Sequence, residues 1–445
     1  LDLHFPMEKG EYGRRISELE KSMDFQLDLL QKQAVEEALT KGVVVVTGGP
    51  GTGKTTTINL MIRCFEMEKM DIVLAAPTGR AAKRMTEATG YEAKTIHRLL
   101  EVSGGIEDGD SSHFEKNEDN PIEADAVILD EMSMVDIHLM YSLLKAIVPG
   151  TRLILVGDSN QLPSVGPGNV LKDIIDSKAF SVVRLSKIYR QAESSHIVLD
   201  AHKINAGELI TLDNKNKDFF FFEKKDVRSV MGALVYLVKT RLPEYIGASP
   251  FEIQVLTPMR KGELGVEHLN EVLQYYLNPA SESKKEKEGR TGVFREGDKV
   301  MQVKNNYKLE WKITNAKGFS IEEGLGVFNG DMGIIKQINT YSERITVVFD
   351  ENREAEYPFS SLDELELAYA ITIHKSQGSE YPAVVLPLLS GPPILCNRNL
   401  LYTAITRAQK CVAIAGRQSM VEQMIHNETE QKRYSGLNDC LKEGL

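Results

Sequence analysis

Short apolar runs alternate with helical segments along much of the chain. Apolar residues recur at helical spacing over residues 26–41, and the β-branched run Val43–Val46 follows, which predicts a strand buried on both faces. Further apolar runs, separated by helical segments, are Ile72–Ala76, Ala126–Leu129, Leu153–Val156 and Val182–Leu185. Strands that alternate with helices predict a parallel sheet covered by helices.

The same alternation returns later in the chain. Its apolar runs are Ile253–Leu256, Ala383–Leu386 and Val412–Ala415, and we expect Phe219–Phe222 to be a further buried strand. This pattern predicts a second α/β domain.

Residues 293–357 interrupt the second α/β pattern with short strands of alternating polarity. The strands we expect are Lys299–Val303, Gly333–Ile338 and Arg344–Phe349. Asn329-Gly330-Asp331 predicts a hairpin turn. We therefore expect a small β insertion within the second α/β domain.

The composition agrees with a soluble globular protein of several domains. The 445 residues, 42% hydrophobic and 26% charged, suffice for more than one core, and no apolar stretch reaches the roughly 18 residues that a membrane helix needs. The start, Leu1–Pro6, lacks the features of a signal peptide and an initiator Met, so we expect residues upstream to be missing. Four cysteines without a CxxC pair favour a reducing, cytoplasmic environment.

A glycine-rich loop follows the first buried strand and precedes a helix that we expect from Lys54 to about Lys69. The loop matches G-x-x-x-x-G-K-[ST], in which backbone N–H groups point at phosphate oxygens. Lys54 is expected to reach the β- and γ-phosphates of ATP, and Thr55 to bind Mg²⁺. The predicted nucleotide-binding residues of this loop are Gly48, Gly49, Pro50, Gly51, Thr52, Gly53, Lys54, Thr55 and Thr56.

The strand Ala126–Leu129 ends in two carboxylates, Asp130 and Glu131. Asp130 is placed to hold Mg²⁺ directly or through water, and Glu131 to orient and deprotonate the attacking water. A surface acidic pair at a strand end is the alternative, which the upstream phosphate loop disfavours.

Together these motifs resemble those of superfamily 1 helicases, and specifically the RecD-like group of the 5′→3′ branch. The resemblance runs from about Gln31 to Arg407 and keeps the order of the family's motifs. Besides the ATP motifs above, the segments that carry it are Ala76–Ala82, Thr95–His97, Gly157–Pro163, Ile188–Gln191, Val255–Met259, Gly297–Gln302, Asn329–Asp331, His374–Glu380 and Leu401–Ala408. His374–Glu380 departs from the form expected of the 3′→5′ branch, and we therefore expect 5′→3′ movement.

The resemblance implies further ATP-site residues. Gln31 corresponds to an adenine-reading glutamine, with Gln33 as a near alternative, and Gln161 to a sensor of the γ-phosphate. Arg190 and Arg407 would contact the γ-phosphate, Arg407 as an arginine finger, so that hydrolysis depends on domain closure. The expected catalytic set is Lys54, Glu131, Gln161, Arg190 and Arg407. Further expected ATP-binding residues are Tyr189, Gly378 and Glu380.

The residues that the resemblance places against a DNA strand are mostly polar rather than basic. Hydroxyls and amides hold phosphates without reading sequence, which agrees with a net charge of −11 that argues against a general nucleic-acid binder. The alternative for each is a local cap or turn hydrogen bond. These residues are Pro77, Thr78, Thr95, His97, Thr257, Pro258, His374, Ser376 and Gln377.

The resemblance implies an α/β fold of two RecA-like motor domains, each a parallel sheet flanked by helices. After an N-terminal linker at 1–25, the first motor domain spans 26–185, with a small pin-like insertion at about 101–122. The second motor domain spans 186–292 and 358–445, and an SH3-like insertion spans 293–357. The pin segment is acidic, which puts strand separation in doubt because a pin that works against bases favours an apolar tip.

The function we expect is an ATP-dependent 5′→3′ DNA helicase or translocase of DNA repair or recombination. It would use ATP and Mg²⁺, act on single-stranded DNA and single-strand/duplex junctions, and work as a monomeric motor. An RNA-directed helicase of the same superfamily is one alternative. An ATP-gated nucleic-acid-binding subunit with little unwinding is another. The sequence leaves open whether the chain joins a recombination complex.

Overall fold

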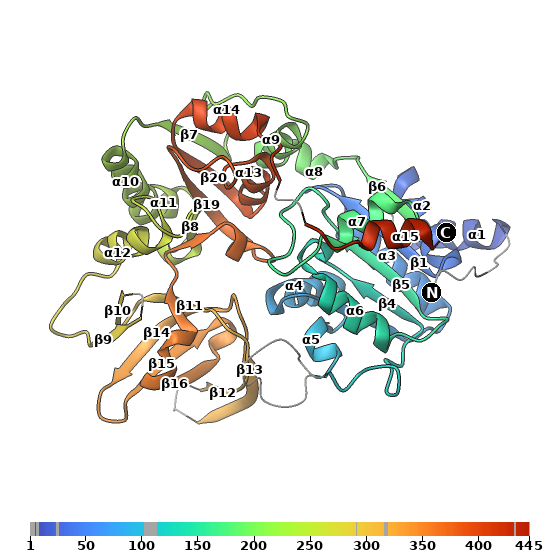
Figure 1. Cartoon of the computed structure of the whole chain (residues 1–445), viewed down its shortest axis with the longest axis horizontal. Coiled ribbons are helices and arrows are strands. Elements are labelled where there is room, and N and C mark those ends of the chain that lie inside the picture. Colours follow the sequence, from blue (N-terminus) through green and yellow to red (C-terminus); the bar gives the residue numbers. More distant parts are fainter. Residues whose placement is uncertain are drawn as a thin grey trace. The chain divides into compact units, whose positions relative to one another are not determined.

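A computed structural model describes residues 5, 9–23, 26–101, 114–290, 292–315, 319–430 and 433–444. The chain divides into two compact units, residues 1–198 with 431–445, and residues 199–430. Figure 1 shows the helices and strands of each unit. Most of the pin predicted at about 101–122 lies outside the described residues, which resume at Phe114.

The first unit is built on a six-stranded parallel sheet with the strand order β3-β2-β4-β5-β1-β6. The apolar runs predicted to be strands in this part of the chain are all strands. Their bounds are β1 Val43–Gly48, β2 Ile72–Ala76, β3 Ala93–Thr95, β4 Ala126–Leu129, β5 Arg152–Gly157 and β6 Ser181–Leu185. The helices are α1 Lys9–Met23, α2 Leu29–Thr40, α3 Lys54–Met67, α4 Gly79–Thr89, α5 Ile96–Leu99, α6 Ile137–Ala146, α7 Val170–Ser177 and α8 Arg190–Glu193.

Strand β1 is buried on both faces, as its unbroken apolar run predicts. Val44 and Val46 pack in one core with residues of α2 and α3. Val43 and Val45 pack in a second core with residues of α6 and α7. Because helices cover both faces, no position of the strand can be polar until the strand reaches its end at the phosphate loop.

The second unit contains a five-stranded parallel sheet with the order β18-β8-β19-β20-β7. Its strands are β7 Phe219–Glu223, β8 Ile253–Thr257, β18 Ala370–Thr372, β19 Tyr381–Leu388 and β20 Ala408–Gly416. The helices of this part of the chain are α9 His196–Asn205, α10 Val227–Tyr236, α11 Leu242–Ile246, α12 Val266–Leu277, α13 Arg398–Ile405 and α14 Gln418–His426. The predicted strands of this domain, Phe219–Phe222 included, are confirmed.

The β insertion forms a seven-stranded antiparallel sheet with the order β13-β12-β16-β15-β14-β11-β17, beside a two-stranded hairpin of β9 and β10. The strands are β9 Glu286–Gly289, β10 Gly292–Arg295, β11 Lys299–Gln302, β12 Asn306–Thr314, β13 Ser320–Val327, β14 Met332–Asn339, β15 Arg344–Phe349, β16 Glu354–Pro358 and β17 Leu365–Leu367. The hairpin predicted at Asn329–Asp331 is wrong. Gly330 does turn the chain at a φ of 95°, but β13 pairs with β12, whereas β14 pairs with β15 and β11.

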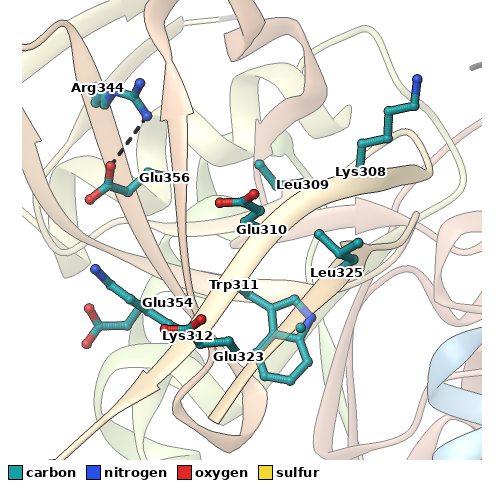
Figure 2. A pocket seen from close by; sticks show the side chains of 11 residues that line it. Lys308, Leu309, Glu310, Trp311, Lys312, Glu323, Leu325, Arg344, Glu354 and Glu356 are labelled. Atoms are coloured by element: carbon teal, nitrogen blue, oxygen red, sulfur yellow. Dashed lines mark hydrogen bonds and ion pairs between the residues drawn. The ribbon is translucent and has the colours of Figure 1, made fainter. Parts of the chain in front are cut away.

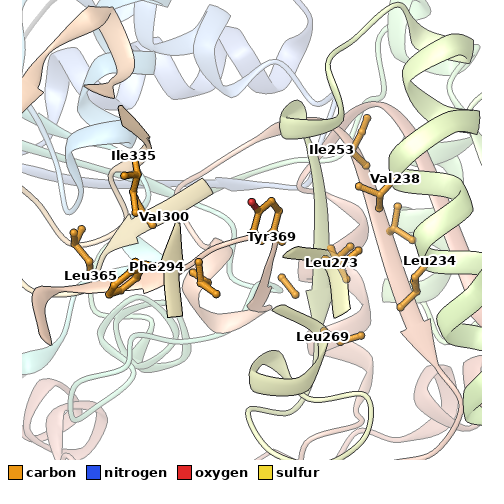
Figure 3. Close-up of a cluster of buried hydrophobic side chains, with 14 of the residues drawn as sticks. Leu234, Val238, Ile253, Leu269, Leu273, Phe294, Val300, Ile335, Leu365 and Tyr369 are labelled. Carbon is orange, nitrogen blue, oxygen red and sulfur yellow. The ribbon is translucent and has the colours of Figure 1, made fainter. Parts of the chain in front are cut away.

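One hydrophobic core joins the insertion to the helices of the second unit (Figure 3). Leu234 and Leu273 come from α10 and α12, whereas Val300 and Ile335 come from the insertion strands β11 and β14, and all four belong to the same buried cluster. The insertion therefore shares its core with the α/β part rather than forming an independent one.

The buried carboxylate of Asp298 links the insertion to the α/β part of the second unit. It accepts hydrogen bonds from Gln274 Nε2 at 2.6 Å, Asn278 Nδ2 at 2.7 Å, Tyr369 Oη at 2.8 Å and the Arg295 N–H at 2.6 Å. Burial raises the pKa of Asp298, although these four donors act in the opposite direction. The donors come from both the helical part and the insertion, so the carboxylate links the two.

We expect Asp298→Ala to lower the free energy of unfolding by about 3 kcal/mol, because several buried donors would lose their acceptor. Chemical denaturation measures the loss. Asp363→Ala is the matched control, since Asp363 forms an exposed pair with Lys304 and should contribute less than about 1 kcal/mol. Equal losses for the two variants would contradict the role given to Asp298.

The C-terminal segment packs on the first unit. Arg433 Nη1 donates to the Gly168 carbonyl at 3.1 Å, Ser435 Oγ donates to Asp173 Oδ2 at 2.7 Å, and α15 (Leu437–Glu443) contributes Leu437 and Leu441 to the core around α7. The sequence analysis assigned residues 186–292 and 358–445 to the second motor domain, whereas residues 186–198 and 431–445 group with the first unit. The apolar face of α15 can be recognised in the sequence, but the sequence does not indicate which part of the fold that face packs against.

Candidate active site

The phosphate loop connects β1 to α3 as predicted. Gly51 and Gly53 have φ values of 72° and 80°, which a residue with a side chain rarely adopts. Thr52 Oγ1 donates to the Gly49 carbonyl at 2.8 Å and closes the loop from inside. Lys54 Nζ donates to the carbonyls of Gly48 at 2.6 Å and Gly49 at 3.0 Å, so its charge lies within the loop.

Gln31 and Tyr189, which the resemblance assigned to the ATP site, both lie against this loop. A Cβ atom at Gly53 would be 2.9 Å from Gln31 Nε2 and 2.9 Å from Tyr189 Cε2. Gln31 is fully buried, and no described group accepts a hydrogen bond from its Nε2. A buried donor without an acceptor is costly, and the edge of a bound base would supply the acceptor.

Asp28 orders both of these residues. Its Oδ1 accepts from the Gln31 N–H at 2.9 Å as the N-cap of α2, and its Oδ2 accepts from Tyr189 Oη at 2.6 Å. Burial raises the pKa of Asp28, but the hydrogen bonds from Tyr189 and the helix N–H groups outweigh it and hold the pKa below its usual value. Burial, together with the hydrogen bond to Asp28, raises the pKa of Tyr189. Sequence reasoning missed Asp28, although the Asp-x-x-Gln spacing of a capping box marks it.

We expect Gln31→Ala to reduce the preference for ATP over GTP by about tenfold in kcat/KM, because the buried amide would no longer pair with one base and reject the other. Steady-state turnover with each nucleotide measures the ratio. Gln33→Ala is the matched control and tests the alternative glutamine. A ratio that changes only in Gln33→Ala would transfer the role to Gln33.

The two carboxylates lie at the end of β4, next to β2 in the sheet, with Leu129 in register with Ala75. Asp130 Oδ1 accepts from the Glu131 N–H at 2.8 Å. Burial raises the pKa of Asp130 to about 6, assisted by the Glu131 charge and opposed by the positive charge of Lys54. Lys54 of the phosphate loop is therefore near enough to affect the pKa of Asp130. This supports the prediction that the phosphate loop and the Asp130-Glu131 pair belong to one site.

Glu131 itself has a left-handed backbone with a φ of 55°. This conformation is uncommon for a residue with a side chain, and it turns the chain sharply after the strand. Arg84 Nη2 donates to Glu131 Oε1 at 2.8 Å. Arg84 is absent from the sequence-based site, because nothing in the local pattern of α4 indicates that it reaches the end of β4.

The segment Gly157–Pro163 follows β5 and adds Gln161 to the same unit. Gln161 is 9% exposed, and its Nε2 donates to Asp158 Oδ2 at 3.4 Å. Within the described part of the chain, its buried Oε1 has no hydrogen-bond donor. The Ser159 N–H donates to Thr47 Oγ1 at 3.3 Å and ties this segment to β1.

In the first unit, the two threonines predicted to contact DNA are the N-caps of helices. Thr78, which follows Pro77 at the end of β2, accepts from the Ala81 N–H at 3.2 Å as the N-cap of α4. Thr95 accepts from the Arg98 N–H at 3.1 Å as the N-cap of α5. Burial lowers the pKa of His97, against the charge of Asp136, so its ring is predominantly neutral at pH 7. These bonds are the local alternative that the sequence left open, and the contacts with DNA remain predictions.

In the second unit, the sheet brings two predicted DNA motifs together. Thr257 and Thr372 end the neighbouring strands β8 and β18 in register, so Thr257–Pro258 and His374–Gln377 leave the same edge. Thr257 is fully buried and donates to the Leu264 carbonyl at 2.7 Å, and Ser376 is fully buried and donates to the Ile373 carbonyl at 2.6 Å. Gln377 is 5% exposed. The hydroxyls of Thr257 and Ser376 thus stabilise the two loops from inside, whereas His374 is partly exposed.

Of the two arginines predicted to contact the γ-phosphate, the structure describes the side chain of Arg407 but not that of Arg190. Arg190 opens α8, but its side chain lies outside the described residues. Arg407 is 3% exposed, and its guanidinium donates to the carbonyls of Thr403 and Ser379. In the motif before it, Gly378 has a φ of 72° and Glu380 accepts from Gln409 Nε2 at 3.2 Å. The roles of these four residues towards ATP remain predictions.

A pocket with a volume of about 700 Å³ lies on the insertion sheet (Figure 2). Trp311 and Leu325 give it an apolar part, while Lys308, Glu310 and Arg344 are among its charged lining residues. None of the residues predicted for the ATP site or the DNA contacts lines this pocket.

Three family models match successive parts of the chain. They are an AAA domain at residues 31–167, the SH3 domain of ATP-dependent RecD-like DNA helicases at 269–349, and a UvrD-like helicase C-terminal domain at 367–415. Among solved structures, Bacteroides Pif1 bound to single-stranded DNA has a TM-score of 0.51 at 19% identity, covering 90% of this chain and 94% of that one. At this identity the likeness shows the fold alone.

Curated relatives are closer in sequence. The ATP-dependent RecD2 DNA helicase of Deinococcus radiodurans is 36% identical over 386 residues, which are 87% of this chain and 48% of the relative. The RecBCD enzyme subunit RecD of Mycolicibacterium smegmatis is 31% identical over 93% of this chain and 74% of its own length, and that of Mycobacterium tuberculosis is 33% identical over 89% and 70%. The chain thus spans about half the length of the Deinococcus relative.

An AAA domain, an SH3 domain and a helicase C-terminal domain in this order, on parallel sheets flanked by helices, define a helicase of superfamily 1. The chain belongs to the RecD-like helicases within that class. The predicted family and fold class are therefore confirmed. None of the helices in the described ranges is long and apolar enough to cross a membrane.

Proposed function

We propose that the chain is an ATP-driven motor that moves 5′→3′ along single-stranded DNA and separates duplex DNA at junctions. The observation that carries this proposal is the phosphate loop itself, since Gln31 lies against it and the charge of its Lys54 acts on Asp130, the neighbour of Glu131. Its setting in a RecD-like chain supports a helicase rather than another P-loop enzyme.

Each of these residues has a defined task in the proposal. Lys54 neutralises the β- and γ-phosphates, and the backbone N–H groups of the loop cradle them. The hydroxyl of Thr55 and the carboxylate of Asp130 are hard oxygen donors of the kind that Mg²⁺ prefers, so these two would hold the ion, which supplies charge neutralisation when bound. Glu131 takes the proton of the attacking water, and the buried Oε1 of Gln161 is suited to orient that water.

Arg190, at the start of α8 in the first unit, and Arg407, in the second unit, would supply positive charge to the γ-phosphate, so that turnover depends on closure. The polar residues at the strand ends would hold the phosphates of the DNA strand without reading its sequence. We propose that the motor works as a monomer in the cytoplasm, in DNA repair or recombination. The relatives named as RecBCD subunits make assembly with recombination proteins a further proposal.

ATP-driven strand displacement on matched duplexes with either a 5′ or a 3′ single-stranded tail tests the proposal, with Glu131→Gln as the inactive control. We expect displacement from the 5′ tail alone. Displacement from the 3′ tail alone would overturn the polarity and leave the motor. ATP turnover that is stimulated by DNA without displacement would indicate a translocase that does not unwind. Stimulation by RNA but not by DNA would favour the RNA-directed alternative.

A further inference from the structure

The predicted catalytic base is paired with an arginine from the helix of a predicted DNA motif. Arg84 Nη2 lies 2.8 Å from Glu131 Oε1, and the two side chains are 29% and 15% exposed. The pair is therefore partly shielded from water, which strengthens it relative to an ion pair on the open surface. The distance also corresponds to a charge-assisted hydrogen bond rather than to a loose electrostatic contact.

The sheet explains how the pair forms. β2 and β4 are neighbouring parallel strands, and the Asp130 N–H donates to the Ala75 carbonyl at 3.0 Å. The loop before α4 and the two carboxylates therefore leave the same edge of the sheet. Side chains in a helix lean towards its N-terminus, so Arg84 points back towards that edge. The helix begins at the N-cap Thr78, within the motif predicted to contact the DNA strand.

The pair affects what Glu131 can do. A general base must offer a carboxylate oxygen to the water that it deprotonates. An oxygen that already accepts a hydrogen bond from a guanidinium is less available to accept one from water. In this arrangement Oε1 of Glu131 is engaged by a residue on the helix of the predicted DNA motif.

We propose that Arg84 is a positioning residue that restrains Glu131 until a DNA strand binds at the Thr78 end of α4. The phosphates of the strand attract the guanidinium of Arg84, the pair with Glu131 weakens, and the carboxylate turns to the water. This inference rests on the proposed function and deepens it, because it names the contact through which the strand regulates hydrolysis. The coupling lies within the first unit and adds to any dependence on domain closure.

Steady-state ATP turnover with and without an oligothymidylate strand tests the proposal in Arg84→Gln. We expect the rate without the strand to rise about fivefold, the factor expected on release of a partly shielded ion pair. The rate with saturating strand should stay within about twofold of the parent protein, so the stimulation ratio falls. Lys83→Gln is the matched control, since Lys83 is exposed on the same helix and forms an ion pair with Glu87.

Arg84→Lys is a second, more conservative variant in case Arg84→Gln fails to fold. It keeps the positive charge but lacks the several planar N–H donors of the guanidinium. We expect it to give a stimulation ratio between those of the parent protein and Arg84→Gln. An unchanged ratio in a folded Arg84 variant, or equal falls in both rates, would overturn the inference while leaving the motor intact. A parent protein whose turnover does not respond to the strand would instead overturn the proposed function.

Discussion

Replacement of Glu131 by glutamine is expected to lower steady-state ATP turnover by roughly 10²–10⁴-fold while nucleotide binding persists. The amide has nearly the shape of the carboxylate, and its oxygen can still accept the hydrogen bond from Arg84. It cannot take a proton from water, so the loss falls on hydrolysis. Turnover with saturating single-stranded DNA, together with the Kd of a fluorescent ATP analogue, separates the two effects.

The matched control is Glu123→Gln, which makes the same chemical change at an exposed glutamate of the first unit. We expect its turnover to stay within about twofold of the parent protein. If Glu131→Gln retained the parent activity on tailed duplexes, hydrolysis would not drive the work. The ATP-gated binding subunit would then become the better description of the chain.

The strands of both α/β parts were predictable because covered parallel strands leave an unbroken apolar signature. Val43–Val46 contributes to two cores at once, so each of its four positions must be apolar. The phosphate loop was predictable for a different reason. Gly51 and Gly53 have positive φ values and Lys54 folds onto the loop carbonyls, so the chemistry and the backbone restrict the same residues.

Contacts between distant segments were not predictable from local patterns. Tyr189 and Asp28 are separated by 161 positions, and neither neighbourhood indicates the other. Arg84 reaches Glu131 only because β2 and β4 are adjacent in the sheet, which is a property of the topology.

The direction in which the side chains of the predicted DNA motifs point was also not predictable from the sequence. A motif indicates that a threonine or serine is required but not which way its hydroxyl points. The hydroxyls of Thr257 and Ser376 turn inwards to backbone carbonyls. If these residues contribute to the grip on DNA, they therefore do so by shaping the loops that carry His374 and its neighbours.

Replacement of Arg407 by lysine is expected to lower ATP turnover about a thousandfold, the magnitude typical of an arginine finger. In the second unit its Nε, Nη1 and Nη2 donate to Thr403 O, Ser379 O and Thr406 Oγ1 at 3.2, 3.3 and 3.4 Å. These bonds are long, so they hold the guanidinium in place without consuming much of its capacity to bind an anion. A lysine can satisfy one of these acceptors but cannot present the planar fork to a phosphate.

The same three bonds raise the competing explanation that Arg407 only fastens β20 to α13 and the loop at Ser379. Thermal unfolding separates the two, with Arg417→Lys as the control at an exposed arginine that also donates to a backbone carbonyl. If Arg407 is an arginine finger, Arg407→Lys loses ATP turnover while its melting temperature stays within a few degrees of that of the parent protein. If Arg407 is only a structural anchor, Arg407→Lys lowers the melting temperature while the folded fraction keeps its turnover. That result would remove Arg407 from the proposed catalytic set.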